Sequence, residues 1–248
     1  FHNFTLLSMN LAIDIGNSSC KAGIYSPEKK EYSTYSGGPD KFFLDDILTR
    51  FRVKRAIIST VRPGHTLFTD ILEKAGVESL VLSHKTPLPF KVHYESPETL
   101  GTDRLAAVAG ACNMFPDTKV FIIDAGTAVT YDLLGADNIY HGGNISPGLQ
   151  MRFRALHEFT GRLPLVERGN SFGNLGVNTP DAIRSGVQTG LIFEINDYIR
   201  TLKNKHDGMK VIITGGDAEF LSDKLEKRCI LIPDLVIDGL NYILNYNA

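Results

Sequence analysis

Two stretches of the sequence carry the same arrangement of an aspartate and a glycine. In LAIDIGNSSCKAGIY, residues 11–25, an apolar run leads to Asp14 and a turn begins at Gly16. In VFIIDAGTAVTYDLL, Asp124 and Gly126 occupy the same places 110 residues later. Each stretch predicts a β-hairpin with a carboxylate at its mouth. One such turn is typical of an ordinary hairpin, but two copies separated by nearly half the chain indicate a duplication.

The first of these turns has the residue types that bind phosphate. Gly16 lets backbone N–H groups come close to an anion, Ser18 and Ser19 add hydroxyl donors, and Lys21 adds a positive charge. The alternative is that Asp14 only stabilises its own turn by bonding to nearby backbone. The duplication favours a phosphate-binding turn.

A third candidate is the tetrapeptide Gly-Thr-Asp-Arg at residues 101–104, which opens a helix of small residues that Pro116 ends. At a helix N-terminus the dipole favours negative charge, so Asp103 could accept the proton of an alcohol. The guanidinium of Arg104 has the geometry to bind a carboxylate. From these residues alone, a helix-capping Asp103 and a solvent-exposed Arg104 explain the pattern somewhat better.

Composition limits the classes of partner. The 248 residues are 43% hydrophobic and 22% charged, and 26 basic against 28 acidic residues give a net charge of -2. Nucleic acid is not expected as a partner, because phosphate backbones require concentrated positive charge. The longest apolar run is shorter than the roughly 18 residues of a membrane helix, so no membrane association is expected.

The cysteines and the first residues predict a cytoplasmic protein. Cys20, Cys112 and Cys229 lie far apart, which argues against a zinc site and against a disulfide framework. Residues 1–8 lack the basic segment of a signal peptide, and we interpret them as an extension that precedes Met9.

Strand and helix patterns alternate along the chain, which predicts an α/β fold. Residues 83–99 hold three prolines and are expected to be irregular. Thr179 and Pro180 predict the N-cap and first residue of a long helix. The expected strands are 11–14, 20–25, 30–36, 55–60, 79–82, 120–124, 129–134, one near 139, and 209–214; the expected helices are 42–51, 65–75, 102–115, 149–159, 179–203, 218–227 and 235–246.

The order of these elements resembles the actin-like, sugar-kinase and Hsp70 ATPase superfamily. The resemblance implies an α/β fold built from a duplicated ribonuclease-H-like domain (the actin-like ATPase fold), with two similar halves whose mixed sheets are flanked by helices. It also implies that the two hairpins hold ATP phosphates and that the turn at residues 215–217 approaches the adenosine. The sequence has neither a Walker A motif nor G-x-G-x-x-G.

Six motifs in order are similar to those of type III pantothenate kinases, and the match runs from Met9 onward. The family more often has threonine where this chain has Ser18, which keeps a hydroxyl group. Accessory factors linked to virulence regulation share these motifs. The motifs are DIGNSSCK at 14–21, GTDR at 101–104, DAGTAVTYD at 124–132, GGNISPG at 142–148, NTPDAIRSG at 178–186 and ITGGDA at 213–218.

The family resemblance assigns roles to individual residues. It implies phosphorylation of the primary hydroxyl of pantothenate by ATP, the first step of coenzyme A biosynthesis, with Asp103 as the proton acceptor. Asp14 would hold Mg²⁺, and Asp124 would bind a monovalent cation, K⁺ or NH₄⁺. The ATP contacts implied are Asp14, Gly16, Asn17, Ser18, Ser19, Lys21 and Thr127; the pantothenate contacts implied are Tyr94, Gly101, Thr102, Arg104 and Thr179.

The same resemblance implies two domains, residues 9–117 and 118–248, and a homodimer. The helix after Pro147 and the long helix from Thr179 are the expected dimer contacts. Two alternative functions stay open on the residues alone. One is another small-molecule kinase of the superfamily, such as a sugar kinase, and the other is a nucleotide-binding regulatory protein without turnover.

Overall fold

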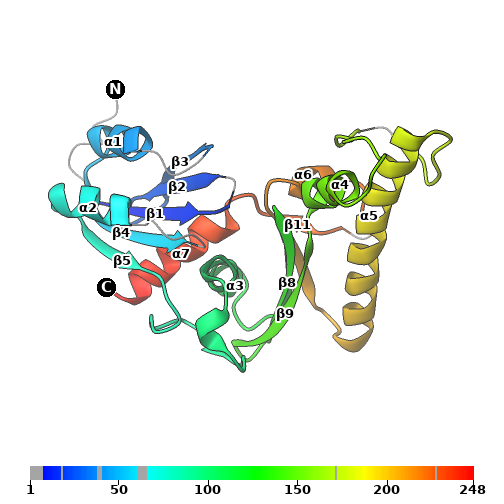
Figure 1. The fold of residues 1–248 in the computed structure, drawn as a ribbon. Coiled ribbons are helices and arrows are strands. Elements are labelled where there is room, and N and C mark those ends of the chain that lie inside the picture. The colour runs from blue at the N-terminus through cyan, green and yellow to red at the C-terminus, as the bar shows by residue number, and fades with distance from the viewer. Residues whose placement is uncertain (1–7, 18, 38–40, 61–65, 171, 227) are drawn as a thin grey trace. The chain divides into compact units, whose positions relative to one another are not determined.

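The computed structural model describes residues 8–17, 19–37, 41–60, 66–170, 172–226 and 228–248. The chain divides into two compact units (Figure 1). The first unit contains residues 1–116, 138–140 and 234–248, and the second contains residues 117–137 and 141–233. The C-terminal segment therefore belongs to the first unit. Among the described helices, none has the length and apolar character needed to cross a membrane.

The two sheets repeat one strand order, which confirms the predicted duplicated α/β fold. In each sheet a central antiparallel hairpin, β1–β2 or β7–β8, is continued on its other side by two parallel pairings. The first sheet has the order β3(Lys30–Ser36), β2(Cys20–Tyr25), β1(Met9–Ile15), β4(Val53–Thr60), β5(Glu78–Val81). The second has the equivalent order β9(Ile139–Pro147), β8(Ala128–Leu134), β7(Val120–Ala125), β10(Lys210–Thr214), β11(Ile230–Leu231), with a sixth short strand, β6(Lys91–Val92), on the outer side of β9.

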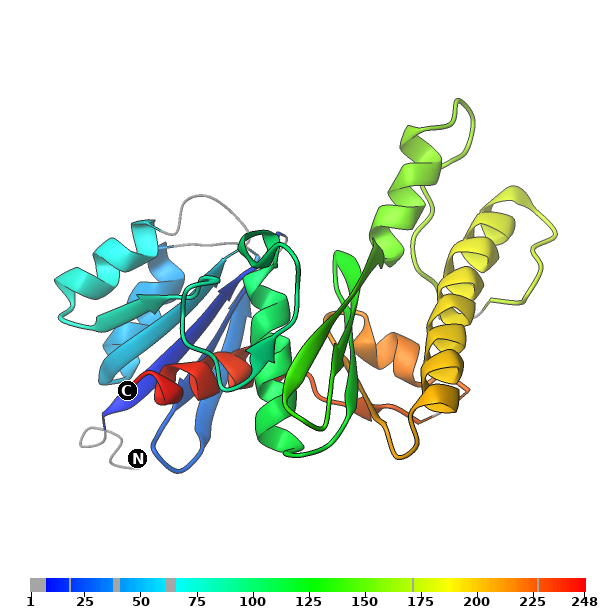
Figure 2. The same ribbon diagram turned by 90° about the horizontal axis from the view of Figure 1, so that it is seen from below.

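Helices cover both faces of the first sheet, as the period of two along β1 requires. Leu11, Ile13 and Ile15 point into a core shared with α1(Lys41–Arg50) and α2(Thr66–Lys74). On the opposite face Asn10 donates a hydrogen bond of 3.0 Å to Asn241 of α7(Leu235–Tyr246). Figures 1 and 2 show α7 on the face of this sheet that lies away from α1.

A close helix contact completes the first unit. Helix α3(Thr102–Met114) lies against α7, and both contribute a glycine where they meet. A methyl group on Gly239 would overlap the carbonyl oxygen of Ala106, and one on Gly110 would lie 2.5 Å from the carbonyl oxygen of Leu235. The helices can approach this closely only because neither glycine has a side chain.

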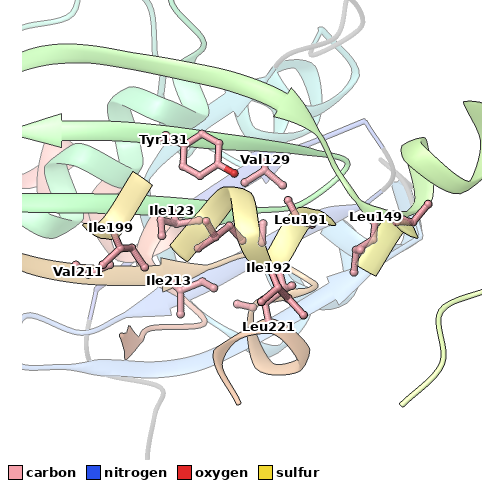
Figure 3. Packing of buried hydrophobic residues seen from close by; sticks show 14 of the residues in the cluster. Ile123, Val129, Tyr131, Leu149, Leu191, Ile192, Ile199, Val211, Ile213 and Leu221 are labelled. Carbon is pink, nitrogen blue, oxygen red and sulfur yellow. The ribbon is translucent and has the colours of Figure 1, made fainter. Parts of the chain in front are cut away.

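The core of the second unit lies between its sheet and three helices, α4(Leu149–Glu158), α5(Thr179–Lys205) and α6(Ala218–Ser222). Figure 3 shows Ile123, Val129 and Ile213 of the sheet packed with Leu191 of α5 and Leu221 of α6. The apolar face of β7 follows the alternation expected for a strand with one face in this core.

Most predicted elements are confirmed, and the differences lie at ends and in short pieces. The proline-rich segment contains strand β6(Lys91–Val92) and a 3₁₀ turn at Pro97–Thr99, so its prediction as irregular was wrong in part. Strand β6 pairs with Ile139 and Tyr140 of β9, a pairing between distant residues that no local pattern reveals. Helix α6 ends at Ser222, earlier than predicted. His65, which was expected to begin α2, lies outside the described residues.

Candidate active site

Asp14 stands at the end of β1 between two polar neighbours. It pairs across the hairpin with Lys21 on β2, and it lies in parallel register with Ser59 on β4, whose hydroxyl group bonds to the carboxylate. Its Oδ1 atom is buried and has no hydrogen-bond partner among the described residues. A buried oxygen of this kind is costly unless a ligand, an ion or water completes it.

The ionisation of Asp14 reflects this enclosure. Burial, and to a smaller extent the nearby Asp103 carboxylate, raise its pKa to about 6, although the Ser59 hydrogen bond and the Lys21 charge act in the opposite direction. The ionised form is therefore the costly form in the protein without ligands.

Replacement of Asp14 by Asn is expected to stabilise the ligand-free protein while removing activity. A carboxyl group with a raised pKa binds its proton more tightly in the folded state, so folding stability falls as the pH rises from about 4 to 6. Above pH 6 the Asn variant should be more stable by about 1–3 kcal/mol, and the difference should vanish near pH 4. Calorimetric melting of both proteins without nucleotide or divalent cation measures this; a less stable variant at pH 7.5 would contradict it.

The first turn closes tightly. The Gly16 amide donates to the carbonyl oxygen of Ser19 at 2.9 Å, and the side chains of Asn17 and Ser19 are exposed at the tip. Ser18, predicted as a phosphate contact, lies outside the described residues. The predicted turn is therefore present, with its described polar side chains open to solvent.

Lys21, beside this turn, forms an ion pair with a residue from the C-terminal part of the chain. Its ammonium group lies 2.6 Å from Asp234, the residue that precedes α7, and Asp234 also binds Lys30 at 2.6 Å. Burial acts to raise the pKa of Asp234, but hydrogen bonds from Lys21 and Lys30 outweigh it and lower the pKa. Sequence reasoning missed Asp234 because it is more than 200 residues from Lys21 and belongs to no recognised motif.

The Gly-Thr-Asp-Arg segment forms the first turn of α3, as predicted. The Arg104 amide donates to Asp103 Oδ1 at 2.8 Å, and a methyl group on Gly101 would overlap this same oxygen. Thr102 Oγ1 lies 3.0 Å from Ser59 Oγ. Arg104 is only 5% exposed, so the alternative of a surface charge is wrong. The first unit thus brings Asp14 and Asp103 together through Ser59 and Thr102.

The two remaining predicted substrate contacts belong to different units. In the first unit Tyr94 stacks on Tyr140, with ring centroids 6.3 Å apart. In the second unit Thr179 is exposed at the first position of α5. The N-cap of α5 is Asn178, whose side chain accepts from the Asp181 amide at 2.9 Å, so the prediction of Thr179 as N-cap was wrong by one residue.

The second hairpin repeats the first with different partners. Asp124 pairs across the hairpin with Thr130, where the first hairpin has a lysine, and lies in parallel register with Thr214. The carbonyl oxygen of Thr127 accepts a hydrogen bond of 3.1 Å from the Gly148 amide. Gly215 has φ +96°, and a methyl group there would overlap Asp124 Oδ1. The second turn is therefore enclosed by two glycine-containing segments.

The turn at residues 215–217 is held by an arginine that sequence reasoning missed. Arg168 lies 2.6 Å from Asp217 and 4.8 Å from the centre of the Phe220 ring. Burial raises the pKa of Asp217, although Arg168 opposes the shift. The irregular segment that carries Arg168 offers no periodic signal from which this contact could have been predicted.

A cation bound in this candidate site would have a single carboxylate group as its acidic protein ligand. Among the described residues no three His, Cys, Asp or Glu side chains gather as a metal-binding cluster. Mg²⁺ needs few protein ligands, because in nucleotide sites it takes one or two carboxylates together with phosphates and water. The arrangement around Asp14 is compatible with this mode.

Comparisons with known proteins show the family of this chain. The type III pantothenate kinase family matches residues 10–201. The type III pantothenate kinase of Bacteroides fragilis is 42% identical over 96% of this chain and 98% of its own, and that of Porphyromonas gingivalis is 41% identical over 98% and 100%.

A solved structure supports the fold alone. The inorganic polyphosphate/ATP-glucomannokinase of Arthrobacter shares it with a TM-score of 0.51 at 13% identity, over 97% of this chain and 100% of that one. The fold is thus one found among actin-like ATPase relatives. The chain belongs to the type III pantothenate kinase family, whose reaction, the phosphorylation of pantothenate, is its enzymatic function.

Proposed function

We propose that this kinase transfers the γ-phosphoryl group of ATP to the primary hydroxyl of pantothenate, with Asp103 as the base. The observation that carries the proposal is the chain of contacts from Asp14 through Ser59 and Thr102 to the first turn of α3. It links a phosphate-binding turn to a carboxylate suited to proton transfer within one unit. Such positioning is what phosphoryl transfer chiefly requires.

The residues at the first turn fit ATP with Mg²⁺. The orphaned Oδ1 of Asp14 is the kind of hard oxygen that Mg²⁺ or its bound water takes, and the exposed side chains of Asn17 and Ser19 can donate hydrogen bonds to an anion. When bound, ATP with Mg²⁺ supplies the phosphoryl group and neutralises its charge. Asn17, Ser18, Ser19, Lys21 and Thr127 are the other proposed ATP contacts.

The chain's own residues would orient pantothenate and remove its proton. Asp103 Oδ1 is held by the Arg104 amide, so we assign proton acceptance to Oδ2. The buried guanidinium of Arg104 is proposed to bind the pantothenate carboxylate, since an arginine fork matches that group. Gly101, Thr102, Tyr94 and Thr179 are proposed to line the same substrate.

One assay tests the activity against its alternatives. Purified protein receives ATP, Mg²⁺ and K⁺ with either pantothenate or glucose, and ADP release is measured. The proposal requires ADP release that depends on pantothenate. Release with glucose alone would favour a sugar kinase, and no release with either would favour a regulatory protein.

Asp124 is proposed to bind a monovalent cation, K⁺ or NH₄⁺. Its carboxylate is approached closely by the backbone of Gly215, which could add oxygen ligands of the hard type that such cations prefer. Exchange of K⁺ for Na⁺ is expected to lower turnover several-fold in the parent protein. The Asp124→Asn variant should turn over slowly and equally in the two salts. If the parent enzyme is indifferent to the exchange, the assignment fails.

A homodimer formed through the second unit is also proposed. Phe193 of α5 is 60% exposed and lies one helical turn from Gly190, beside which the surface is open. An exposed aromatic side chain on a helix surface is available for contact with a second copy of the chain. Other exposed apolar side chains of this unit are Ile145, Met151, Phe159, Leu165, Leu175 and Val177.

The expected outcome of Phe193→Glu is a monomer, because a charge would have to be buried in the contact. Phe42→Glu is the matched control, since Phe42 is 79% exposed on α1 of the first unit. Light scattering after size exclusion should find the parent and the control as dimers. A Phe193→Glu protein that stays dimeric would remove α5 from the contact.

We also propose a cellular location and a domain division for this protein. A cytoplasmic location is supported by Cys20, Cys112 and Cys229, which form no disulfide with one another. The division into two ribonuclease-H-like domains at residues 117 and 118 is supported by the repeated strand order of the sheets, although residues 234–248 belong to the first compact unit.

A further inference from the structure

A polar network in the second unit joins α4 and α5 to the segment before α4. Arg152 of α4 lies 2.5 Å from Glu194 of α5, and Tyr131 donates to the other oxygen of Glu194 at 2.7 Å. Arg152 and Glu194 are 22% and 25% exposed in their side chains. Burial alone would raise the pKa of Glu194, but hydrogen bonds from Arg152, Tyr131 and Ser146 lower it. The pair is thus ionised and mostly enclosed.

Arg152 also fixes the backbone that leads into α4. Its Nε atom donates to the carbonyl oxygen of Pro147 at 2.8 Å, and its terminal nitrogen donates to Ser146 Oγ at 2.8 Å. One guanidinium group therefore holds a carboxylate, a hydroxyl and a carbonyl oxygen at once. A lysine ammonium could not reproduce this fork.

The segment that Arg152 fixes lies directly against the second turn. The Gly148 amide donates to the carbonyl oxygen of Thr127 at 3.1 Å. A methyl group on Gly148 would overlap the carbonyl oxygen of Gly126. The peptide between Pro147 and Gly148 thus has its carbonyl oxygen tied to Arg152 and its amide tied to Thr127.

We propose that Arg152 and Glu194 are positioning residues for ATP: they set the peptide before α4, and through it the place of Thr127. This inference rests on the proposed function, in which Thr127 contacts ATP. A small displacement of a phosphate-binding turn weakens contacts that depend on exact distance. The network should therefore affect the use of ATP much more than that of pantothenate.

Steady-state kinetics of Arg152→Gln, Arg152→Lys and Thr127→Val test the inference. Arg152→Gln should raise the KM for ATP about five- to thirty-fold, the upper part of the roughly two- to thirty-fold range for residues that act through others, with the KM for pantothenate within about two-fold. Arg152→Lys should have a KM for ATP close to that of Arg152→Gln, because lysine keeps the charge but loses the planar set of N–H donors of the guanidinium group. Since KM does not depend on the fraction of folded enzyme, poor folding alone cannot produce the split.

Arg154→Gln is the matched control, because Arg154 also lies on α4 but pairs with Glu158 in an exposed contact of 2.7 Å. It should leave both KM values unchanged. If Thr127→Val raises the KM for ATP and Arg152→Gln does not, or if Arg152→Gln raises both KM values alike, the inference is wrong while the proposed function stands. If Thr127→Val leaves the KM for ATP unchanged, the proposed role of Thr127 fails and the inference falls with it.

Discussion

Asp103→Asn is expected to lower turnover at least about 10²-fold while ATP binding stays within a few-fold. A positioned general base typically contributes 10² to 10⁴ in rate, which is about 3–5 kcal/mol of barrier. Asn has nearly the same shape, and its carbonyl oxygen can still accept the hydrogen bond from the Arg104 amide that the carboxylate accepts. The variant therefore removes proton acceptance and little else.

The measurement combines single-turnover rates with calorimetric titration of ATP. Glu98→Gln is a suitable control, since Glu98 is an exposed carboxylate in the 3₁₀ turn just before α3. Its turnover should match the parent. Near-normal turnover of Asp103→Asn would remove Asp103 from its role, and a loss of ATP binding in that variant would point to a structural effect instead.

The surroundings of Asp103 show which parts of the site the sequence predicts and which it does not. The motif predicts that a carboxylate begins a helix, and the structure confirms that helix from Thr102 to Met114. The sequence does not reveal that Ser59 on β4 joins Thr102 to Asp14, because strand register is fixed by pairing across the sheet. It also does not reveal that Arg104 is buried, because the same sequence pattern would fit an exposed arginine at least as well.

For the two hairpins, too, the local motif could be predicted from the sequence but the distant contacts could not. Repetition of Asp-x-Gly predicts two equivalent turns, and the repeated strand order confirms that the surrounding sheets are equivalent. The partners that distinguish the turns come from distant parts of the chain. Asp234 reaches Lys21 beside the first turn, and Arg152 holds the segment against the second. Side-chain contacts between residues so far apart leave no local period or spacing from which to predict them.

The position of α7 was the feature of the fold that was hardest to predict from the sequence. Its bounds were predicted correctly from the apolar period of residues 235–246. Its position beside α3 in the first unit, after the chain has completed the second sheet, follows from tertiary packing. The glycines that allow that packing have ordinary helical surroundings in the sequence, and their importance appears only where the two helices meet.

Gly239→Ala should therefore destabilise the protein by about 3 kcal/mol or more. In an isolated helix the change would be favourable by about 1 kcal/mol, because alanine is the better helix former. Here the added methyl group would overlap the carbonyl oxygen of Ala106 and lie 2.6 Å from the amide nitrogen of Gly110. Both obstacles are helix backbone, so the helices must part, and overpacking of a well-packed core typically costs 1–3 kcal/mol even where side chains can move.

Because α3 carries Gly101 to Arg104 at its N-terminus, a shift of the helix should lower turnover as well as stability. Differential scanning calorimetry should find the melting temperature lowered by roughly 6–12 °C, using 2–4 °C per kcal/mol for proteins of this size. Gly161→Ala is the control, since no atom lies within 4 Å of a methyl group there, and its effect should stay within about 0.5 kcal/mol. A Gly239→Ala protein as stable as that control would show that α3 and α7 do not approach as closely as their glycines allow.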